Sequence, residues 1–222
     1  DSKDEKFLIC GTKSGIIIIF SVNGKFFQLI KKLYWHSDEI TSISINDNLN
    51  MFVTTAKDDL INLYLLPTFK LVRTIKVELN KTSSGKDNEV PYLNNVFLSS
   101  NPLPCITVYI SQLRKFRTYT INGINIFENN ENSPSELGCP IICRDLNFQE
   151  FLIYGIKDGI KIRKFPDMSI VYLIDLQKES PPLTLSLSKD NRFCYAYYSQ
   201  DEIYVISREG TIMISELKQK GQ

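Results

Sequence analysis

The residue that could take the largest number of chemical roles is His36, the only histidine in the chain. An imidazole can act as a base, bind a metal, or link a carboxylate to a hydroxyl, because one nitrogen donates while the other accepts. Nucleophilic catalysis lacks its usual companions here, since the sequence has no second histidine and no Gly-x-Ser-x-Gly elbow. A zinc site would need cysteine or carboxylate partners for His36, and Cys139 and Cys143 have three intervening residues on a strand-like segment, which is not a zinc knuckle. We therefore predict a structural His36, no catalytic residue, no metal and no cofactor.

Two polar residues follow His36 at a characteristic spacing. Asp58 lies 22 residues and Tyr64 lies 28 residues beyond it. This spacing resembles a WD repeat, in which a Gly-His pair opens the unit, an aspartate occupies the turn between the second and third strands, and Trp-Asp ends the third strand. The resemblance implies a buried, hydrogen-bonded structural tetrad of His36, Thr54, Asp58 and Tyr64.

The pattern departs from the WD repeat at several positions. Trp35 stands where the family has Gly, Tyr64 where it has Trp, and Leu65 where it has the final Asp. A later unit keeps an aspartate, Asp158, but has no histidine, so its network is expected to be absent or different.

The elements that would position these residues are short strands joined by recurring turns. The segment 36–77 contains four runs of β-branched and aromatic residues separated by polar clusters, as expected for four antiparallel strands. The turn before the third strand recurs in similar form at Lys13, Lys57, Lys157 and Gln200. Leu66-Pro67 and Phe165-Pro166 open a second recurring turn, and Asn-Gly pairs replace it elsewhere.

The repeats predict an all-β fold. Their period is about 44 residues, with one interval of about 56, which is the range of a propeller blade. We predict a single β-propeller with blades at roughly 7–33, 36–77, 95–127, 140–176 and 183–217. Segments 80–92 and 128–138 are expected to be flexible loops. The first blade lacks its first strand, so the chain is interpreted as part of a ring of about seven blades, with a five-bladed closure as the alternative.

Composition narrows the class of protein. The net charge is +1, which gives no global field for nucleic acid. The apolar runs are too short for a membrane span and no signal peptide is visible, so a cytoplasmic location is expected. The five cysteines are an odd, scattered set, which favours reduced thiols over a disulfide framework.

The strongest family resemblance covers residues 60–201. Leu98-Ser99-Ser100 with Pro102-Leu103-Pro104, the turn at Tyr119–Gly123, and Leu152–Gly155 are similar to the C-terminal propeller of BEACH-domain proteins of the neurobeachin and lysosomal-trafficking-regulator type. The resemblance implies BEACH and PH-like domains upstream in the same chain. It also implies a part in vesicle and membrane trafficking and a peripheral association with endomembranes.

Three functions follow as expectations. The first is a non-catalytic scaffold that binds other proteins through the rim of the propeller. Its candidate rim residues are Lys13, Trp35, Ser37, Asp38, Lys57, Asp59, Lys157, Gln200 and Asp201.

The two alternatives use other side chains. Lipid or RNA could bind the basic clusters Arg114-Lys115-Phe116-Arg117 and Lys161-Ile162-Arg163-Lys164, although a solvated strand edge is the simpler interpretation of both. A hydrolase could use Asp58 and Asp158 in the propeller channel.

Overall fold

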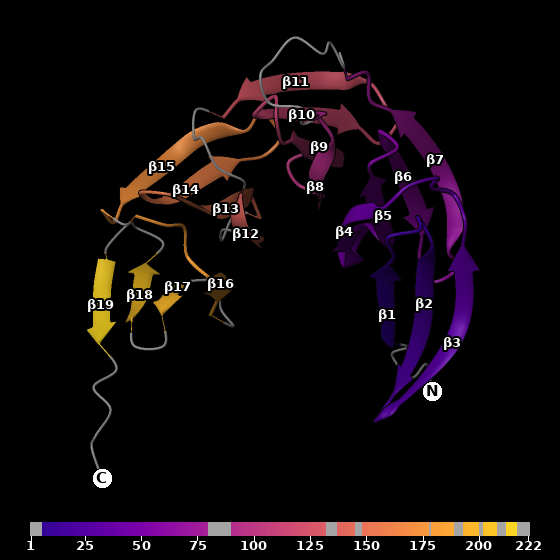
Figure 1. Ribbon diagram of the computed structural model, residues 1–222, viewed down its shortest axis with the longest axis horizontal. Helices are drawn as coiled ribbons and strands as arrows, with labels where there is room; N and C mark the ends of the chain where they lie inside the picture. Colours follow the sequence, from indigo (N-terminus) through magenta and orange to yellow (C-terminus); the bar gives the residue numbers. More distant parts are fainter. Residues whose placement is uncertain are drawn as a thin grey trace. The chain divides into compact units, whose positions relative to one another are not determined.

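The computed structural model describes residues 6–79, 90–131, 137–144, 148–177, 179–188, 193–199, 202–207 and 212–216. Its regular structure consists of short antiparallel strands and one 3₁₀ turn, η1 (Asp47–Leu49) (Figure 1). The chain divides into two compact units. The first comprises residues 1–98 and 104–128, and the second comprises residues 99–103 and 129–222.

Three sheets form from the first 130 residues. They consist of β1 (Lys6–Gly11), β2 (Ile17–Asn23) and β3 (Phe26–Leu33); β4 (Ile40–Asn46), β5 (Met51–Ala56), β6 (Leu60–Leu65) and β7 (Lys70–Lys76); and β8 (Leu93–Ser99), β9 (Cys105–Ile110), β10 (Lys115–Thr120) and β11 (Asn125–Asn130). In each sheet the strands are neighbours in chain order, as short hairpin connections require.

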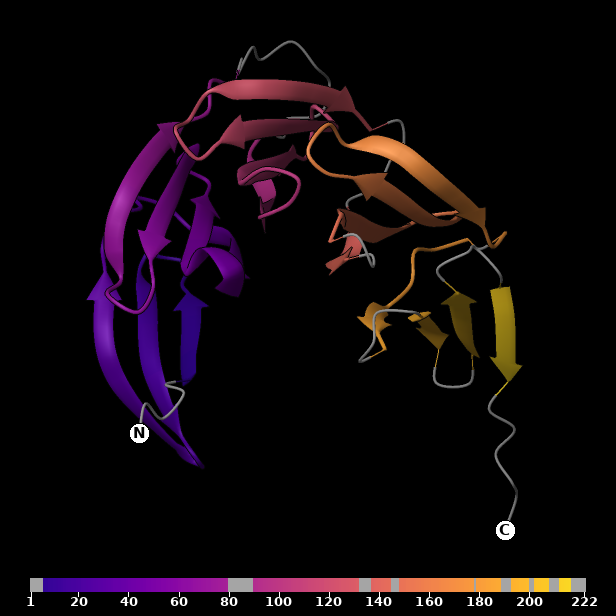
Figure 2. The same cartoon turned by 180° about the vertical axis from the view of Figure 1, so that it is seen from behind.

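Two more sheets follow in the second unit. They consist of β12 (Gly138–Arg144), β13 (Glu150–Ile156), β14 (Gly159–Lys164) and β15 (Ser169–Asp175), and of β16 (Thr184–Leu187), β17 (Phe193–Ser199), β18 (Glu202–Ser207) and β19 (Ile212–Glu216). Figure 2 shows the same sheets from behind.

The predicted fold class is confirmed: the protein is an all-β propeller with five antiparallel sheets as its blades. The first sheet has three strands and the other four have four each, as expected from the missing first strand of the first repeat. The simple meander order within each sheet is that of a propeller blade.

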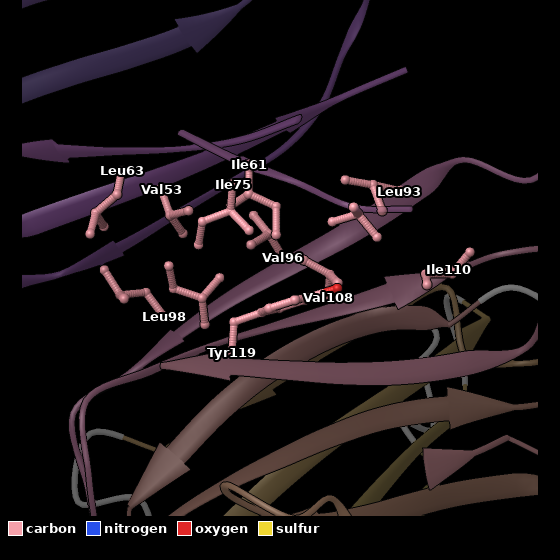
Figure 3. Packing of buried hydrophobic residues seen from close by; sticks show 12 residues of the cluster. Val53, Ile61, Leu63, Ile75, Leu93, Val96, Leu98, Val108, Ile110 and Tyr119 are labelled. Atoms are coloured by element: carbon pink, nitrogen blue, oxygen red, sulfur yellow. The ribbon is translucent and has the colours of Figure 1, made fainter. Parts of the chain in front are cut away.

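Apolar side chains hold neighbouring sheets of the first unit together. One cluster joins the first two sheets and includes Ile17, Ile19, Phe52 and Tyr64, all without solvent exposure. A larger cluster joins the second and third sheets. Figure 3 shows its side chains meeting from both sheets, among them Val53, Leu63, Val96 and Val108. Each such buried side chain contributes roughly 1.5–3 kcal/mol, so sheet packing is a main source of stability.

The second unit has its own core between its two sheets. Ile153, Ile160 and Ile174 of one sheet pack with Leu185, Ala196 and Tyr204 of the next. Close backbone approach contributes as well. A Cβ added to Gly155 would lie 2.3 Å from a ring carbon of Pro182, so no larger residue fits without movement.

The recurring turns have matching hydrogen bonds in the two units. The Phe69 amide donates to the Leu65 carbonyl at 2.8 Å, and the Met168 amide donates to the Lys164 carbonyl at the same distance. Both residues have positive φ, 54° for Phe69 and 58° for Met168. The repeat read from the sequence is therefore also a repeat of backbone geometry.

The predicted bounds of the second loop, 128–138, need correction. Strand β11 continues to Asn130 and β12 begins at Gly138, so both ends of that segment are strand, and β8 begins at Leu93 where the third blade was expected from residue 95. Glu131, which follows β11, is buried. Residues 80–89 and 132–136 lie outside the described residues. The predicted third blade was cut short because its last strand, NIFENN, is mostly polar on an exposed outer edge.

Candidate functional site

His36 lies in the connection between β3 and β4 and is buried against the second sheet. Its Nδ1 lies 3.0 and 3.1 Å from the two carboxylate oxygens of Asp58, and its Nε2 lies 2.8 Å from the Thr54 hydroxyl. The carboxylate can only accept, so Nδ1 carries the proton and donates to Asp58. Nε2 then accepts from Thr54, which defines one neutral tautomer.

Asp58 ties two loops together. It lies in the turn between β5 and β6, and besides His36 it accepts the backbone amide of Ser37 at 2.9 Å and that of Leu60 at 3.1 Å. One carboxylate therefore holds both its own turn and the incoming linker. Burial lowers the pKa of His36 below its ordinary value of 6.5, and the attraction of Asp58 offsets this only in part.

Asn62 occupies the fourth place of the network. Its side-chain amide lies 3.2 Å from His36 Nε2 and donates to the Trp35 carbonyl at 3.2 Å. Its carbonyl oxygen accepts the Thr74 hydroxyl at 2.7 Å. The strand register explains the arrangement, because Thr54, Asn62 and Thr74 are direct partners across β5, β6 and β7.

Tyr64 does not take the fourth place that the WD resemblance implied for it. Its hydroxyl is buried and makes no hydrogen bond. Its register partner is Phe52, and the two rings stack with centroids 4.6 Å apart. Burial raises the pKa of Tyr64 to about 12. The nearby Thr54 and Asn62 oppose this shift without reaching hydrogen-bonding geometry.

The hydrogen-bonded chain has the form of a catalytic triad: Thr54 would be the nucleophile, His36 the base and Asp58 the acid that orients the base. The surroundings do not suit that role. Thr54 has no solvent exposure, and Asn62 competes for the same imidazole nitrogen. A reacting carbonyl cannot approach the Thr54 hydroxyl without opening the sheet interface, so the geometry is suited to fixing the linker and not to acyl transfer.

A second buried polar network replaces this one in the second unit. Glu131, in the connection after β11, receives hydrogen bonds from Tyr154, Lys161 and Arg163, the last at 2.9 Å. Tyr154 and Lys161 are register partners, and Tyr154 lies four residues before Asp158 as Thr54 lies four before Asp58. Glu131 therefore reaches the fourth sheet where His36 reaches the second. The expectation for the histidine-free repeat thus resolves as a different network, built on a carboxylate.

The basic segment 161–164 is not a solvated edge. Lys161 and Arg163 are buried, and only Lys164 is exposed. Arg163 also donates to the Tyr154 hydroxyl at 2.8 Å and to the Met168 carbonyl. The sequence interpretation was wrong because the neutralising carboxylate lies 30 residues away along the chain.

Two of the three charges of the other basic cluster are ion-paired. Lys115 and Arg117 share the Glu128 carboxylate at 2.6 and 2.9 Å, and hydrogen bonding from Lys115 lowers the pKa of Glu128. Phe116 is fully buried. Only Arg114 of this cluster is exposed.

Glu150 is a buried residue that sequence reasoning missed. Its carboxylate accepts the Ser99 hydroxyl at 2.5 Å, the Ser100 amide at 2.8 Å and Arg144 Nε at 2.6 Å. Burial raises the pKa of Glu150, but these donors more than reverse the effect and the pKa is lowered overall. The sequence feature that could have revealed Glu150 is its position as the single charged residue, and the first residue, of the apolar strand EFLIYGI.

The predicted rim residues fall into three groups. In the first unit Lys13, Trp35, Ser37, Asp38 and Lys57 are exposed, and Asp59 is half-buried. Lys57 forms an ion pair with Glu39 at 2.6 Å, which raises its pKa. Lys157 is exposed in the second unit, whereas Gln200 and Asp201 lie outside the described residues.

The predicted hydrolase pair is divided between the units. Asp58 belongs to the first unit and is bound to His36, and Asp158 is an exposed turn residue of the second. Across the described residues, no group of three or more acidic, histidine or cysteine side chains could hold a metal ion, and the five cysteines are free thiols.

Comparisons with known proteins gave no match, either to a protein-family model or to a curated protein. Within the described part of the chain, no helix has the length and apolar character needed to cross a bilayer.

Proposed function

We propose that this chain is a non-catalytic scaffold that binds other proteins through the exposed turns of its propeller. The observation that carries the proposal is that its potentially reactive side chains are engaged in structural hydrogen bonds. His36, Asp58, Glu131 and Glu150 are each bound within polar networks that fix linkers to sheets. A propeller so stabilised offers rigid turns and linkers as its contact surface.

The exposed turns supply suitable chemistry for contacts. Trp35 and the charged residues Lys13, Asp38 and Lys57 lie on turns or linkers of the first unit, and Lys157 lies on a turn of the second. Tryptophan is a frequent anchor of protein interfaces. Exposed charges around such an anchor contribute to specificity and to the rate of association.

The finer proposal is that the chain is the C-terminal propeller of a BEACH-type protein acting in vesicle or membrane trafficking in the cytoplasm. It rests on the resemblance of residues 60–201 alone. Its partners would include BEACH and PH-like domains of the same protein, with peripheral association with endomembranes. Determination of the coding sequence on the N-terminal side of Asp1 tests it, because another domain type there would exclude that family.

The scaffold proposal is tested by reversing the charge of three exposed residues on the turns and linkers. Cross-linked partners of the wild-type chain are identified by quantitative mass spectrometry and compared with those of a variant carrying Lys13→Glu, Asp38→Lys and Lys57→Glu. We expect one or more partners to be lost. Retention of every partner by this variant, with the fold intact by circular dichroism, would reject the assignment of these turns.

The hydrolase alternative is tested separately. Wild-type protein and Asp58→Asn are assayed on ester, phosphoester and glycoside probes. We expect neither protein to turn over any probe, and activity that Asp58→Asn abolishes would overturn the non-catalytic proposal.

A further inference from the structure

A basic and aromatic cleft lies in the first unit where the end of β3 meets the turn before β7. Figure 1 shows the tip of β3 beside the start of β7, and Figure 2 shows the same contact from behind. The cleft measures about 530 Å³ and is lined by β3, the linker after it, and residues 69–71. That volume is within the range of natural binding pockets.

Positive charge gathers on this cleft without a neutralising partner. Lys31, Lys32 and Lys70 line it, and no acidic residue does. Lys31 donates to the Thr68 carbonyl at 3.3 Å, so it is held across the cleft. In the described part of the chain, the side-chain amines of Lys32 and Lys70 form no ion pair or hydrogen bond, and both residues are exposed. This differs from the two basic clusters of the sequence, whose charges are mostly paired.

Two aromatic side chains stand beside these lysines. Tyr34 is 67% exposed and Trp35 is 56% exposed, which are high values for rings of this size. Large exposed aromatic rings mark interaction surfaces because they bury much apolar area at little entropic cost. The floor beneath them is apolar and fixed, since Leu33 and Phe69 are almost fully buried.

The buried network holds this aromatic edge in place. The Trp35 carbonyl accepts the Asn62 amide at 3.2 Å, and the next residue, His36, is bound to both Asp58 and Thr54. The backbone amide of Phe69 donates a hydrogen bond to the Leu65 carbonyl, which fixes the turn beside the cleft. The cleft is therefore pre-organised, which reduces the entropy lost on binding.

We propose that this cleft binds a short acidic peptide segment of a partner protein, with an apolar or aromatic side chain against the exposed rings of Tyr34 and Trp35 and carboxylates beside Lys32 and Lys70. The inference rests on the proposed scaffold function and names the chemistry of one partner. A peptide is favoured over nucleic acid, because a phosphate backbone needs an extended basic track. Here the exposed Asp38 follows closely in the same linker.

The test uses the single tryptophan of the chain, Trp35, as a built-in reporter. The probe is the synthetic peptide Glu-Asp-Glu-Leu-Phe-Glu-Asp, labelled with fluorescein for anisotropy and unlabelled for tryptophan emission. We expect saturable binding with a blue shift of Trp35 emission. We also expect affinity to fall as salt is raised through physiological strength, because the contacts are exposed ion pairs.

Matched charge-reversal variants locate the site. Lys32→Glu with Lys70→Glu should weaken binding roughly ten-fold or more, the scale of an interface hot spot. Lys25→Glu with Lys76→Glu makes the same change in net charge on exposed residues of this unit outside the cleft. This control pair should alter affinity about two-fold or less if the effect is local.

Several outcomes would overturn the inference. Equal weakening by the two variant pairs would mean nonspecific attraction, and peptide binding without change in Trp35 emission would place the peptide elsewhere. Binding of a single-stranded oligonucleotide or of anionic vesicles, lost in Lys32→Glu with Lys70→Glu while the peptide fails to bind, would assign the cleft to another ligand. If partners are captured by the whole chain and this variant retains all of them, the scaffold proposal stands and the cleft assignment fails.

Discussion

The substitution Glu131→Gln should damage the second unit severely. It removes the carboxylate that forms an ion pair with Lys161 and leaves that cation buried, at 9% side-chain exposure, with a neutral amide in place of the carboxylate. Arg163 keeps its hydrogen bonds to Tyr154 and Met168 but loses its ion pair with Glu131. Breaking a buried ion pair from one side costs about 3–5 kcal/mol. For a chain of this size, that loss corresponds to a fall in melting temperature of roughly 6–20 °C.

The assay is urea and thermal unfolding followed by circular dichroism. Glu128→Gln is the matched control, because it removes a carboxylate that also pairs with two cations but is 36% exposed. Its cost should stay near 0–1 kcal/mol. Adding Lys161→Met to Glu131→Gln should recover part of the lost stability, since the uncompensated charge is gone. The reasoning would be refuted if Glu131→Gln were as stable as Glu128→Gln. It would also be refuted if the double variant Glu131→Gln with Lys161→Met were less stable than Glu131→Gln alone.

Three further predictions concern individual side chains. Because folding lowers the pKa of His36, the unfolded chain binds more protons below pH 6.5, so stability should fall as pH drops through that value, and His36→Gln should flatten this dependence in urea titrations. Gly15→Ala should destabilise more than Gly24→Ala in the same assay: both glycines have positive φ, but the new Cβ would lie 2.6 Å from the His36 carbonyl at Gly15 and in open space at Gly24. Burial raises the pKa of Cys194 to about 12, so a maleimide should label it far more slowly than the half-buried Cys10, and equal rates in the native protein would contradict this.

The repeat could be predicted because its turns carry their own chemistry. The turns at Leu66-Pro67 and Phe165-Pro166 are read directly from local sequence, and apolar strands with polar breaks specify antiparallel hairpins. The pairing of His36 with Asp58 was expected from the resemblance of this repeat to a WD repeat, and the two side chains are hydrogen-bonded in the structure.

Choosing the fourth member of the network required register, which local sequence does not determine. Asn62 and Tyr64 are two residues apart on β6 and share a face, so the pattern alone suits either. The register sets Asn62 opposite Thr54 and sets Tyr64 opposite Phe52. The ring then stacks and the amide reaches the imidazole.

Buried charge was the harder feature to predict. Lys161 and Arg163 read as solvent-facing because their partner, Glu131, lies in a polar segment taken for a loop. Ser99 and Ser100 meet Glu150 across about fifty residues of sequence in the same way. Such pairs depend on which linker crosses which sheet, so they follow from the fold and not from a local pattern.

The nitrogen NMR spectrum of His36 tests most directly the claim that the reactive groups of this propeller serve its structure. His36 is the only histidine, so its signals need no assignment by mutation. The account predicts a neutral ring protonated at Nδ1, with a titration midpoint below 6.5. A ring protonated at Nε2, or a midpoint above 6.5 as for a base exposed to solvent beside Asp58, would contradict it.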